Sequence, residues 1–428
     1  MFENLKKQIR NPYVFSILTR IMMVLAAFLF TVIQSRFLGP ELKGQVAVVN
    51  SYTGITSILF EFGIHQAYPY FKKNTDRDIQ PVFLRIALLQ LLINAAVSVL
   101  AILLLHQSLP AKYVAVLIIN PFMVYNRVIA YISLVEMPNR KNLIESLTYV
   151  AELLLVIVLW CCAPASFAIG VAVIAFKDVV MSVVYTIQWR NKLFVAGDSV
   201  KDWVLKVLKF SFFPMLSVLM TTLNYRVDVI MLEGKVTDAA IGVYSIGVSL
   251  AERVWLIPDA MKGVLVSNVA KGKGPEEVAS VIRICNTVCL CLILGLVALG
   301  EIFITLVFGA EYAGAYQVTL ILLIGAVFMV YYKMIAAYNI VLGKQRISFL
   351  FLFISVVGNV LANWILIPKM GIYGAGFASV ISYSICSLLF IVYFIRMTKI
   401  PLSQMLILSA LDFKKIKAKL KKSPHKKD

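Results

Sequence analysis

Twelve apolar stretches, each of membrane-crossing length, follow one another along the 428 residues. A helix needs about 20 apolar residues to span the hydrocarbon of a bilayer. With 61% hydrophobic residues and a mean hydropathy of +0.87, the chain cannot be a soluble globule around one core. We therefore predict an all-α integral membrane protein with twelve transmembrane helices, at residues 14–38, 46–71, 82–105, 113–135, 143–163, 166–189, 208–232, 239–266, 278–308, 316–342, 349–367 and 372–395.

Lys and Arg are distributed unevenly among the connections between these spans. If every span crosses, 26 of them lie on the side of the two termini, whereas five lie on the other side: Arg36, Lys43, Lys112, Lys235 and Lys369. Cytoplasmic loops are enriched in Lys and Arg, so we expect both termini in the cytoplasm. Most of the net charge of +19 is thereby explained by topology, and it needs no nucleic-acid partner.

The longest polar connection falls between the sixth and seventh spans and divides the chain into two halves. We predict an N-terminal six-helix lobe at 1–189, a cytoplasmic linker at 190–207, a C-terminal six-helix lobe at 208–395 and a basic cytoplasmic tail at 396–428. Residues 35–45 and 232–242 form matching polar hairpins, each placed after the first helix of its half. Parallel repeats of this kind commonly enclose a substrate path, so we expect a central cleft between the lobes.

Charged side chains fall inside several predicted spans, where a charge costs about 2.5–3.5 kcal/mol at the bilayer centre on insertion scales. Many lie on polar stripes at helical spacing, chiefly on the first two helices of each half. Such residues normally face a bundle interior or a wet cavity, and the alternative is that they pair to join helices. The candidates are the cations Arg20, Arg127, Lys177, Arg253 and Lys333 and the acids Glu61, Asp228, Glu252, Asp259 and Asp178.

Several short runs resemble a known group of transporters. They are YRVDVIML at 225–232, GVYS at 242–245, ERVWLIP at 252–258, SRFLGP at 35–40, EFG at 61–63 and NWILIPKMGIYGAG at 363–376. In order and spacing they are similar to the polysaccharide transporter branch of the multidrug/oligosaccharidyl-lipid/polysaccharide (MOP) flippase superfamily. The resemblance covers nearly the whole chain.

This resemblance implies a Wzx-type flippase in the bacterial inner membrane, with two MATE-like lobes that form a V. Such a protein turns an undecaprenyl-diphosphate-linked oligosaccharide from the inner to the outer leaflet, for O-antigen, capsule or exopolysaccharide assembly. Its expected partners are the lipid-linked glycan, membrane lipids, polysaccharide polymerase machinery and a proton or Na⁺ as coupling ion. We expect no cofactor.

The proposed task assigns a role to each kind of charge. A diphosphate entering the cleft needs cations, and Arg forms bidentate contacts with phosphate. Arg20 and Arg127 both fall in the cytoplasmic half of their spans, where a headgroup enters. The acids are candidates for binding the coupling ion. For the cations, pairing with Glu61, Glu152, Asp178 or Glu252 remains the alternative.

Two other transport functions stay open: a flippase for another lipid-linked cell-wall precursor, and a MATE-like drug/cation antiporter. A cationic cleft disfavours cationic drugs, because like charges repel. Catalysis has little support, since the D-x-D run at Asp76–Arg77–Asp78 lies in a short loop without a nucleotide-binding domain. The three His residues are too scattered in sequence for a metal site.

Overall fold

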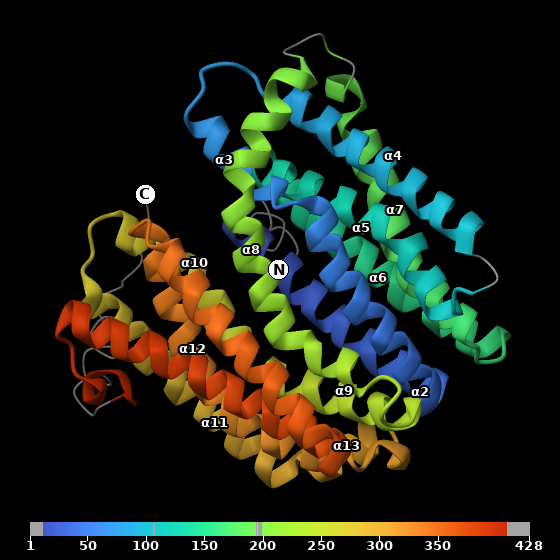
Figure 1. The fold of residues 1–428 in the computed structure, drawn as a ribbon, viewed down its shortest axis with the longest axis vertical. Helices are drawn as coiled ribbons and strands as arrows, with labels where there is room; N and C mark the ends of the chain where they lie inside the picture. The colour runs from blue at the N-terminus through green and yellow to red at the C-terminus, as the bar shows by residue number, and fades with distance from the viewer. Residues whose placement is uncertain (1–11, 106–107, 194, 196–198, 409–428) are drawn as a thin grey trace, which may run out of the picture. The chain divides into compact units, whose positions relative to one another are not determined.

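The structure is a computed structural model that describes residues 12–105, 108–193, 195 and 199–408 (Figure 1). Every regular element in these ranges is a helix. The α-helices are α2 (Pro12–Glu61), α3 (Ile64–Lys73), α4 (Gln80–Leu105), α5 (Ala111–Glu136), α6 (Pro138–Cys162), α7 (Phe167–Leu193), α8 (Val200–Leu232), α9 (Asp238–Arg253), α10 (Leu256–Ala270), α11 (Pro275–Val307), α12 (Ala315–Val341) and α13 (Gln345–Thr398). Short 3₁₀ helices cover Ala310–Tyr312 (η1) and Leu402–Met405 (η2).

Within the described ranges, nine helices are long and apolar enough to cross a membrane, and the bent pair α9–α10 makes a tenth. Helices α2 and α13 contain 50 and 54 residues. Helix α13 includes two predicted spans in tandem, and α2 includes the first predicted span and the larger part of the second. Gly39 (φ 70°) and Gly371 (φ 56°) interrupt them with backbone angles that glycine adopts without steric cost. The prediction of an all-α, multi-span membrane protein is confirmed. The count of twelve crossings stays a prediction.

The span predicted at 46–71 is broken, which corrects the sequence analysis. Helix α2 ends at Glu61, and Phe62 (φ 57°) and Gly63 (φ 72°) adopt left-handed backbone angles before α3 begins. A Cβ atom on Gly63 would lie 2.7 Å from the carbonyl oxygen of Ser211 in α8. Close packing against α8 therefore requires glycine at the break.

The span predicted at 239–266 is also interrupted, between α9 and α10, which differ in direction by 42°. Pro258 has no N–H to donate to the carbonyl of Val254, four residues earlier. The Cys289 thiol on α11 donates to this oxygen instead, at 3.4 Å. The bend thus coincides with a proline, and a cysteine from another helix satisfies the exposed carbonyl.

The described helices belong to two compact units, Met1–Ser245 with Ile304–Ala313 and Ile246–Phe303 with Gly314–Asp428. In the first unit, α2 packs against α5, α6, α7 and α8, and α3 packs against α5 and α8. In the second unit, α12 packs against α10 and α13. The predicted lobes, linker and tail stay predictions. Residues 409–428 of the tail lie outside the described residues.

Two hairpins of the first unit meet through glycines. A Cβ atom on Gly44 would lie 1.7 Å from the carbonyl oxygen of Asp238, and one on Gly242 would lie 2.0 Å from that of Pro40. The hairpins are the pair that the sequence analysis matched between the two halves. Their backbones touch because neither glycine has a side chain.

Candidate functional site

Arg127 lies on α5 of the first unit and points toward α2. Its Nη2 donates to the Oγ of Ser57, a fully buried residue, at 3.1 Å. Its Nη1 is buried and has no hydrogen-bond partner among the residues that the structure describes. Among the described residues it forms no ion pair, although Glu61 and Asp178 are near enough to interact electrostatically. The predicted binding cation therefore has donor capacity that the protein leaves unused.

Glu61 is fully buried at the break between α2 and α3. It accepts hydrogen bonds from the backbone N–H groups of Gly63 (3.0 Å), which directly precedes α3, and of His65 (2.6 Å) in the first turn of α3. Its Oε2 also lies 2.8 Å from Nδ1 of His65, whose ring stacks edge-on against Tyr131 at 4.4 Å. The carboxylate thus caps α3 and contacts a titratable ring.

Asp178 and Lys177 lie side by side in sequence on α7 but have different surroundings. Asp178 is buried, and its Oδ1 accepts from Nδ2 of Asn126 on α5 at 3.3 Å. The ammonium of Lys177 lies 5.3 Å from the centre of the Tyr149 ring on α6. Lys177 forms no ion pair with any described residue, so pairing does not account for its charge.

Two charged residues of this region were missed as site candidates. Lys43, in the first hairpin, is buried and donates to Oε1 of Gln34 at 2.7 Å. Glu152 on α6 is 1% exposed and interacts electrostatically with Lys43, Lys177 and Asp178. The sequence signal was present, since Glu152 belongs to a polar stripe on its span, but it had been interpreted only as a pairing partner.

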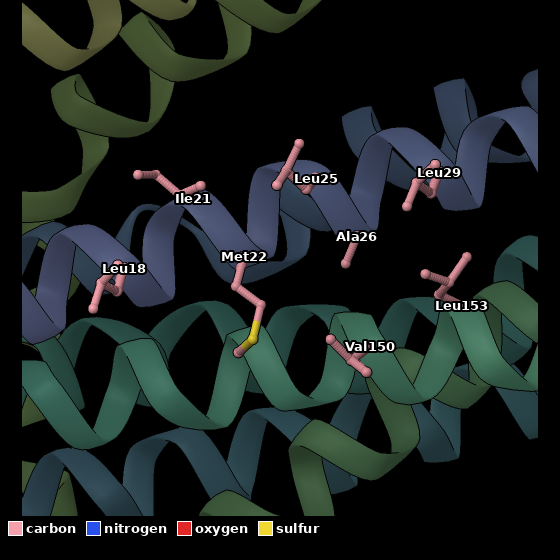
Figure 2. A pocket seen from close by; sticks show the side chains of 8 residues that line it. All are labelled: Leu18, Ile21, Met22, Leu25, Ala26, Leu29, Val150 and Leu153. Carbon is pink, nitrogen blue, oxygen red and sulfur yellow. The ribbon is translucent and has the colours of Figure 1, made fainter. Parts of the chain in front are cut away.

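Arg20 is exposed on α2 and has no partner among the residues that the structure describes. Residues on both sides of Arg20 in sequence help to line a pocket of about 350 Å³ between α2 and α6 (Figure 2). The pocket is lined by Leu18, Ile21, Met22, Leu25, Ala26, Leu29, Val150 and Leu153. At 100° per residue these α2 side chains cover the face opposite Arg20. The pocket has an apolar lining, so it suits a hydrocarbon chain and not a phosphate.

Asp228 is buried on α8 in the first unit. Its Oδ2 accepts a short hydrogen bond from the hydroxyl of Tyr244 on α9, which is fully buried as well. Its Oδ1 accepts from the N–H of Val229 at 2.8 Å. Asp228 therefore lies in a built polar contact between two helices and not against lipid.

The remaining candidates lie in the second unit. Glu252 and Arg253 form the end of α9, directly before the bend. Lys333 on α12 lies 2.8 Å from Oδ1 of Asp259 on α10 and 5.0 Å from the centre of the Trp255 ring. The structure therefore pairs two candidates, Lys333 and Asp259, that the sequence analysis had not paired with each other.

The loop with the D-x-D run has a structural contact. Asp78 lies 3.0 Å from Nζ of Lys192 at the end of α7, and a hydrogen bond from this ammonium holds the pKa of the carboxyl below its usual range. The backbone N–H of Gln80 also donates to Asp78, at 3.2 Å. In the described part of the chain, no three His, Cys, Asp or Glu side chains are placed to bind a metal ion together.

The first unit thus gathers Glu61, Arg127, Lys177 and Asp178, together with Lys43 and Glu152, among α2, α5, α6 and α7. Asp228 lies elsewhere in that unit, and Glu252, Arg253, Asp259 and Lys333 belong to the second unit. The arrangement can bind anions through Arg127 and can exchange protons at its buried carboxyls. Which of these side chains share a cleft stays a prediction.

A family model described as "Polysaccharide biosynthesis protein" matches residues 13–254, more than half of the chain. A search of curated proteins finds no match.

Solved structures of transporters share the fold. The lipid II flippase MurJ, in an inward closed conformation, matches with a TM-score of 0.71 and 16% identity over 96% of this chain and 94% of its own. An inward-facing multidrug resistance MATE family transporter of the MOP superfamily matches with a TM-score of 0.66 and 17% identity, over 96% of this chain and 100% of its own. A MOP superfamily transporter from Pyrococcus furiosus, whose binding pocket is described as reversed in polarity, matches with a TM-score of 0.61 and 15% identity, over 91% of this chain and 96% of its own.

Proposed function

This chain belongs to the polysaccharide biosynthesis protein family and has the fold of MOP superfamily transporters, and from that premise we propose that it is a lipid-linked oligosaccharide flippase. The substrate is an undecaprenyl-diphosphate-linked repeat unit, which moves from the cytoplasmic to the outer leaflet by alternating access. The product serves O-antigen, capsule or exopolysaccharide assembly, and polysaccharide polymerase machinery takes it up.

The observation that carries this proposal is the state of Arg127. Its guanidinium, on the predicted span at 113–135, donates to Ser57, and within the described part of the chain one of its amino groups has no hydrogen-bond partner. A buried donor without a partner costs about 1–3 kcal/mol, more when it is charged. A diphosphate oxygen satisfies this donor and neutralises the charge, because phosphate matches the planar guanidinium.

Arg20 supplies a second cation for the same headgroup. It is exposed on α2, in the half of the span that we assign to the cytoplasmic side. Lys177 adds a third cation in the first unit. In the second unit Arg253 is a separate candidate, and Lys333 is a weaker one because it pairs with Asp259. The polyprenyl tail stays in lipid or in apolar surfaces such as the pocket between α2 and α6 (Figure 2).

The proposed location is the bacterial inner membrane, with both termini in the cytoplasm. The support is the 26 to 5 distribution of Lys and Arg between the two sides. The alternation of the spans has separate support, because Asn142 at the start of α6 donates to Ser16 near the start of α2, at 2.9 Å, and farther along both helices Val150 and Leu153 line one pocket with Met22 and Leu29. The two helices therefore run in the same direction, as the first and fifth spans of an alternating topology must.

Transport in one direction needs an energy source, and we propose an ion gradient. Glu61, Asp178 and Asp228 in the first unit and Glu252 and Asp259 in the second are the candidate carriers. Asp259 is the least favoured candidate, because its ion pair with Lys333 gives it a structural role that needs no coupling ion. Membrane carboxylates of this kind commonly mark ion pathways.

The likeness to MurJ favours one alternative, a flippase for another lipid-linked precursor. The likeness to MATE transporters favours a drug/cation antiporter, but Arg127 and Lys177, which form no ion pair with any described residue, oppose a cationic substrate.

The test is a flipping assay on the full chain in proteoliposomes, with a fluorescent undecaprenyl-diphosphate oligosaccharide. Lipid II and a cationic dye are the comparison substrates. We expect rapid exposure of the oligosaccharide lipid at the opposite leaflet, slower exposure of lipid II and no movement of the dye. A rate no higher than in protein-free vesicles contradicts the proposal, and faster movement of lipid II or the dye establishes the corresponding alternative.

A further inference from the structure

We infer that Glu152 is the proton carrier of the first unit, and that the coupling ion is H⁺ and not Na⁺. The inference rests on the proposed function, because it names the ion that drives flipping and the residue that binds it. Neither residue type nor position had singled out Glu152 among the acids of the spans. The contacts around its carboxyl do so.

Glu152 lies in the middle of α6 and is 1% exposed. None of the described residues donates a hydrogen bond to its carboxyl, and none forms an ion pair with it. Burying a carboxylate in this way is costly, and binding of a proton removes the charge. Among the acids gathered in the first unit Glu152 differs from Glu61 and Asp178, which both accept hydrogen bonds.

Charged groups face Glu152 from two neighbouring helices. Lys43 approaches from α2, and Lys177 and Asp178 approach from α7; all three interact with it electrostatically. Lys43 is held by Gln34, and Lys177 lies over the Tyr149 ring. Other partners therefore hold both ammonium groups. Each is close enough to Glu152 to favour its ionised form over its protonated form, but neither forms an ion pair with it.

From α5, Arg127 connects this group to the acid at the helix break. It interacts electrostatically with both Asp178 and Glu61, and Glu61 contacts His65. Charged and titratable groups therefore continue from Lys43, beside the hairpin that we assign to the outer side, to His65, near the end of the lobe that we assign to the cytoplasmic side. A proton bound at Glu152 has polar groups on both sides of it.

The balance of charge argues against a metal ion. Three carboxylates, those of Glu61, Glu152 and Asp178, are matched by three cations, those of Lys43, Arg127 and Lys177. A metal cation needs several oxygen ligands and a surplus of negative charge, and the ammonium groups beside Glu152 would repel it. A proton needs one carboxyl, so it is the ion that this cluster accommodates.

The experiment measures flipping of the fluorescent oligosaccharide lipid by proteoliposomes under a pH gradient, under a Na⁺ gradient and without a gradient. Internal pyranine reports proton movement at the same time. We expect the pH gradient alone to accelerate the wild type. Glu152→Gln removes the titratable group at nearly constant volume, and we expect it to reduce the rate under the pH gradient to the rate without one.

The matched control is Glu145→Gln, two turns earlier on α6. Glu145 forms an ordinary ion pair with Lys141 at 2.7 Å, so its variant should keep the response to pH. Retained acceleration in Glu152→Gln, or acceleration of the wild type by Na⁺ alone, overturns the inference. Flipping by the wild type that no gradient changes also overturns it but leaves the proposed function intact, whereas absence of flipping contradicts the function itself.

A second variant covers the case in which Glu152→Gln does not accumulate in the membrane. Lys43→Gln removes a positive charge that favours the carboxylate, so the pH of half-maximal coupled rate should move upward. An unmoved pH profile in this variant overturns the role of Glu152.

Discussion

Glu61 binds both the ring and the backbone of His65: its Oε2 lies 2.8 Å from Nδ1, and its Oε1 accepts from the N–H at 2.6 Å. One buried carboxylate therefore contacts both the first turn of α3 and the imidazole of His65. Because the backbone breaks at Phe62 and Gly63, no carbonyl of the same helix is available to accept from the N–H of His65. The Glu61 carboxylate accepts this hydrogen bond in place of a carbonyl.

We expect Glu61→Ala to lower the free energy of unfolding by about 1–3 kcal/mol, since it removes a helix cap and leaves buried donors unpaired. Glu61→Gln keeps one acceptor oxygen and should cost less. Thermal unfolding of the purified protein in detergent measures both. Glu41→Ala, an exposed acid on the same helix, is the control and should unfold like the wild type. Equal stability of the two alanine variants would show that Glu61 does not cap α3.

Arg127→Ala should retain normal membrane abundance and lose affinity for the diphosphate lipid. A charge-assisted contact is worth about 1.5–3 kcal/mol, which corresponds to a loss of about 10- to 150-fold. Arg127→Lys should recover only part of the lost affinity, because an ammonium does not form the bidentate contact. Arg20→Ala should also lower the affinity for the diphosphate lipid.

The measurements for these arginine variants are membrane abundance, binding of the lipid and surface polysaccharide in cells. Arg140→Ala, which removes an exposed charge at the start of α6, is the control. Normal binding at normal abundance would exclude a headgroup role for the residue changed, and a loss of abundance would assign that residue to structure.

Gly44→Ala should destabilise the first unit, because the new Cβ would lie 1.7 Å from the carbonyl oxygen of Asp238. Overpacking of this kind costs about 1–3 kcal/mol or more. Gly54→Ala places the same methyl group on the same helix with nothing within 4 Å. That control should be neutral or slightly stabilising, as expected for a helical glycine in open space. Similar melting temperatures for the two variants would contradict the close contact of the hairpins.

The ion pair between Asp78 and Lys192 predicts a small dependence of stability on pH. The pKa of Asp78 is lowered in the folded protein, so its stabilisation is complete above the ordinary value, about 3.9, and disappears as the pH falls through the lowered one. Both side chains are nearly half exposed, at 48% and 46%, so the effect should stay below about 1 kcal/mol. Unfolding of wild type and Asp78→Asn should differ slightly at pH 7 and converge at strongly acidic pH. A large difference at pH 7, or any loss of transport, would contradict a purely structural role.

Reporter fusions test the topology. Phosphatase fused in the connection at 190–207 or after residue 396 should be inactive, and fusions beside Lys112 and Lys235 should be active, because only exported phosphatase folds. An active fusion at the C-terminus would contradict the twelve-span arrangement with both termini inside.

The fold class was predictable because length and hydropathy dictate it: an apolar segment of bilayer length has few alternatives to a helix. Family membership was likewise predictable from runs such as that at 225–232. The break at Phe62 and Gly63 was not, because it depends on how closely α8 approaches, and nothing in the segment 46–71 reports the position of α8.

The candidate site was predictable only as a set of charges. Helical spacing indicated which residues share a face, and Arg127 and Glu61 are indeed near one another. The pairing of Lys333 with Asp259 and the position of Lys43 beside Glu152 depend on helix rotation and on contacts between segments far apart in the chain. One sequence contains no direct record of such distances.

The bend between α9 and α10 has a mechanical consequence. The carbonyl of Val254 is satisfied by a thiol, a weak donor, so this bond resists little when the two segments change their angle. A serine hydroxyl at the position of Cys289 would bind the same oxygen more strongly and make the joint stiffer. In the second unit, Pro258 therefore removes a backbone hydrogen bond from the bend, and Cys289 of α11 replaces it with a weaker one.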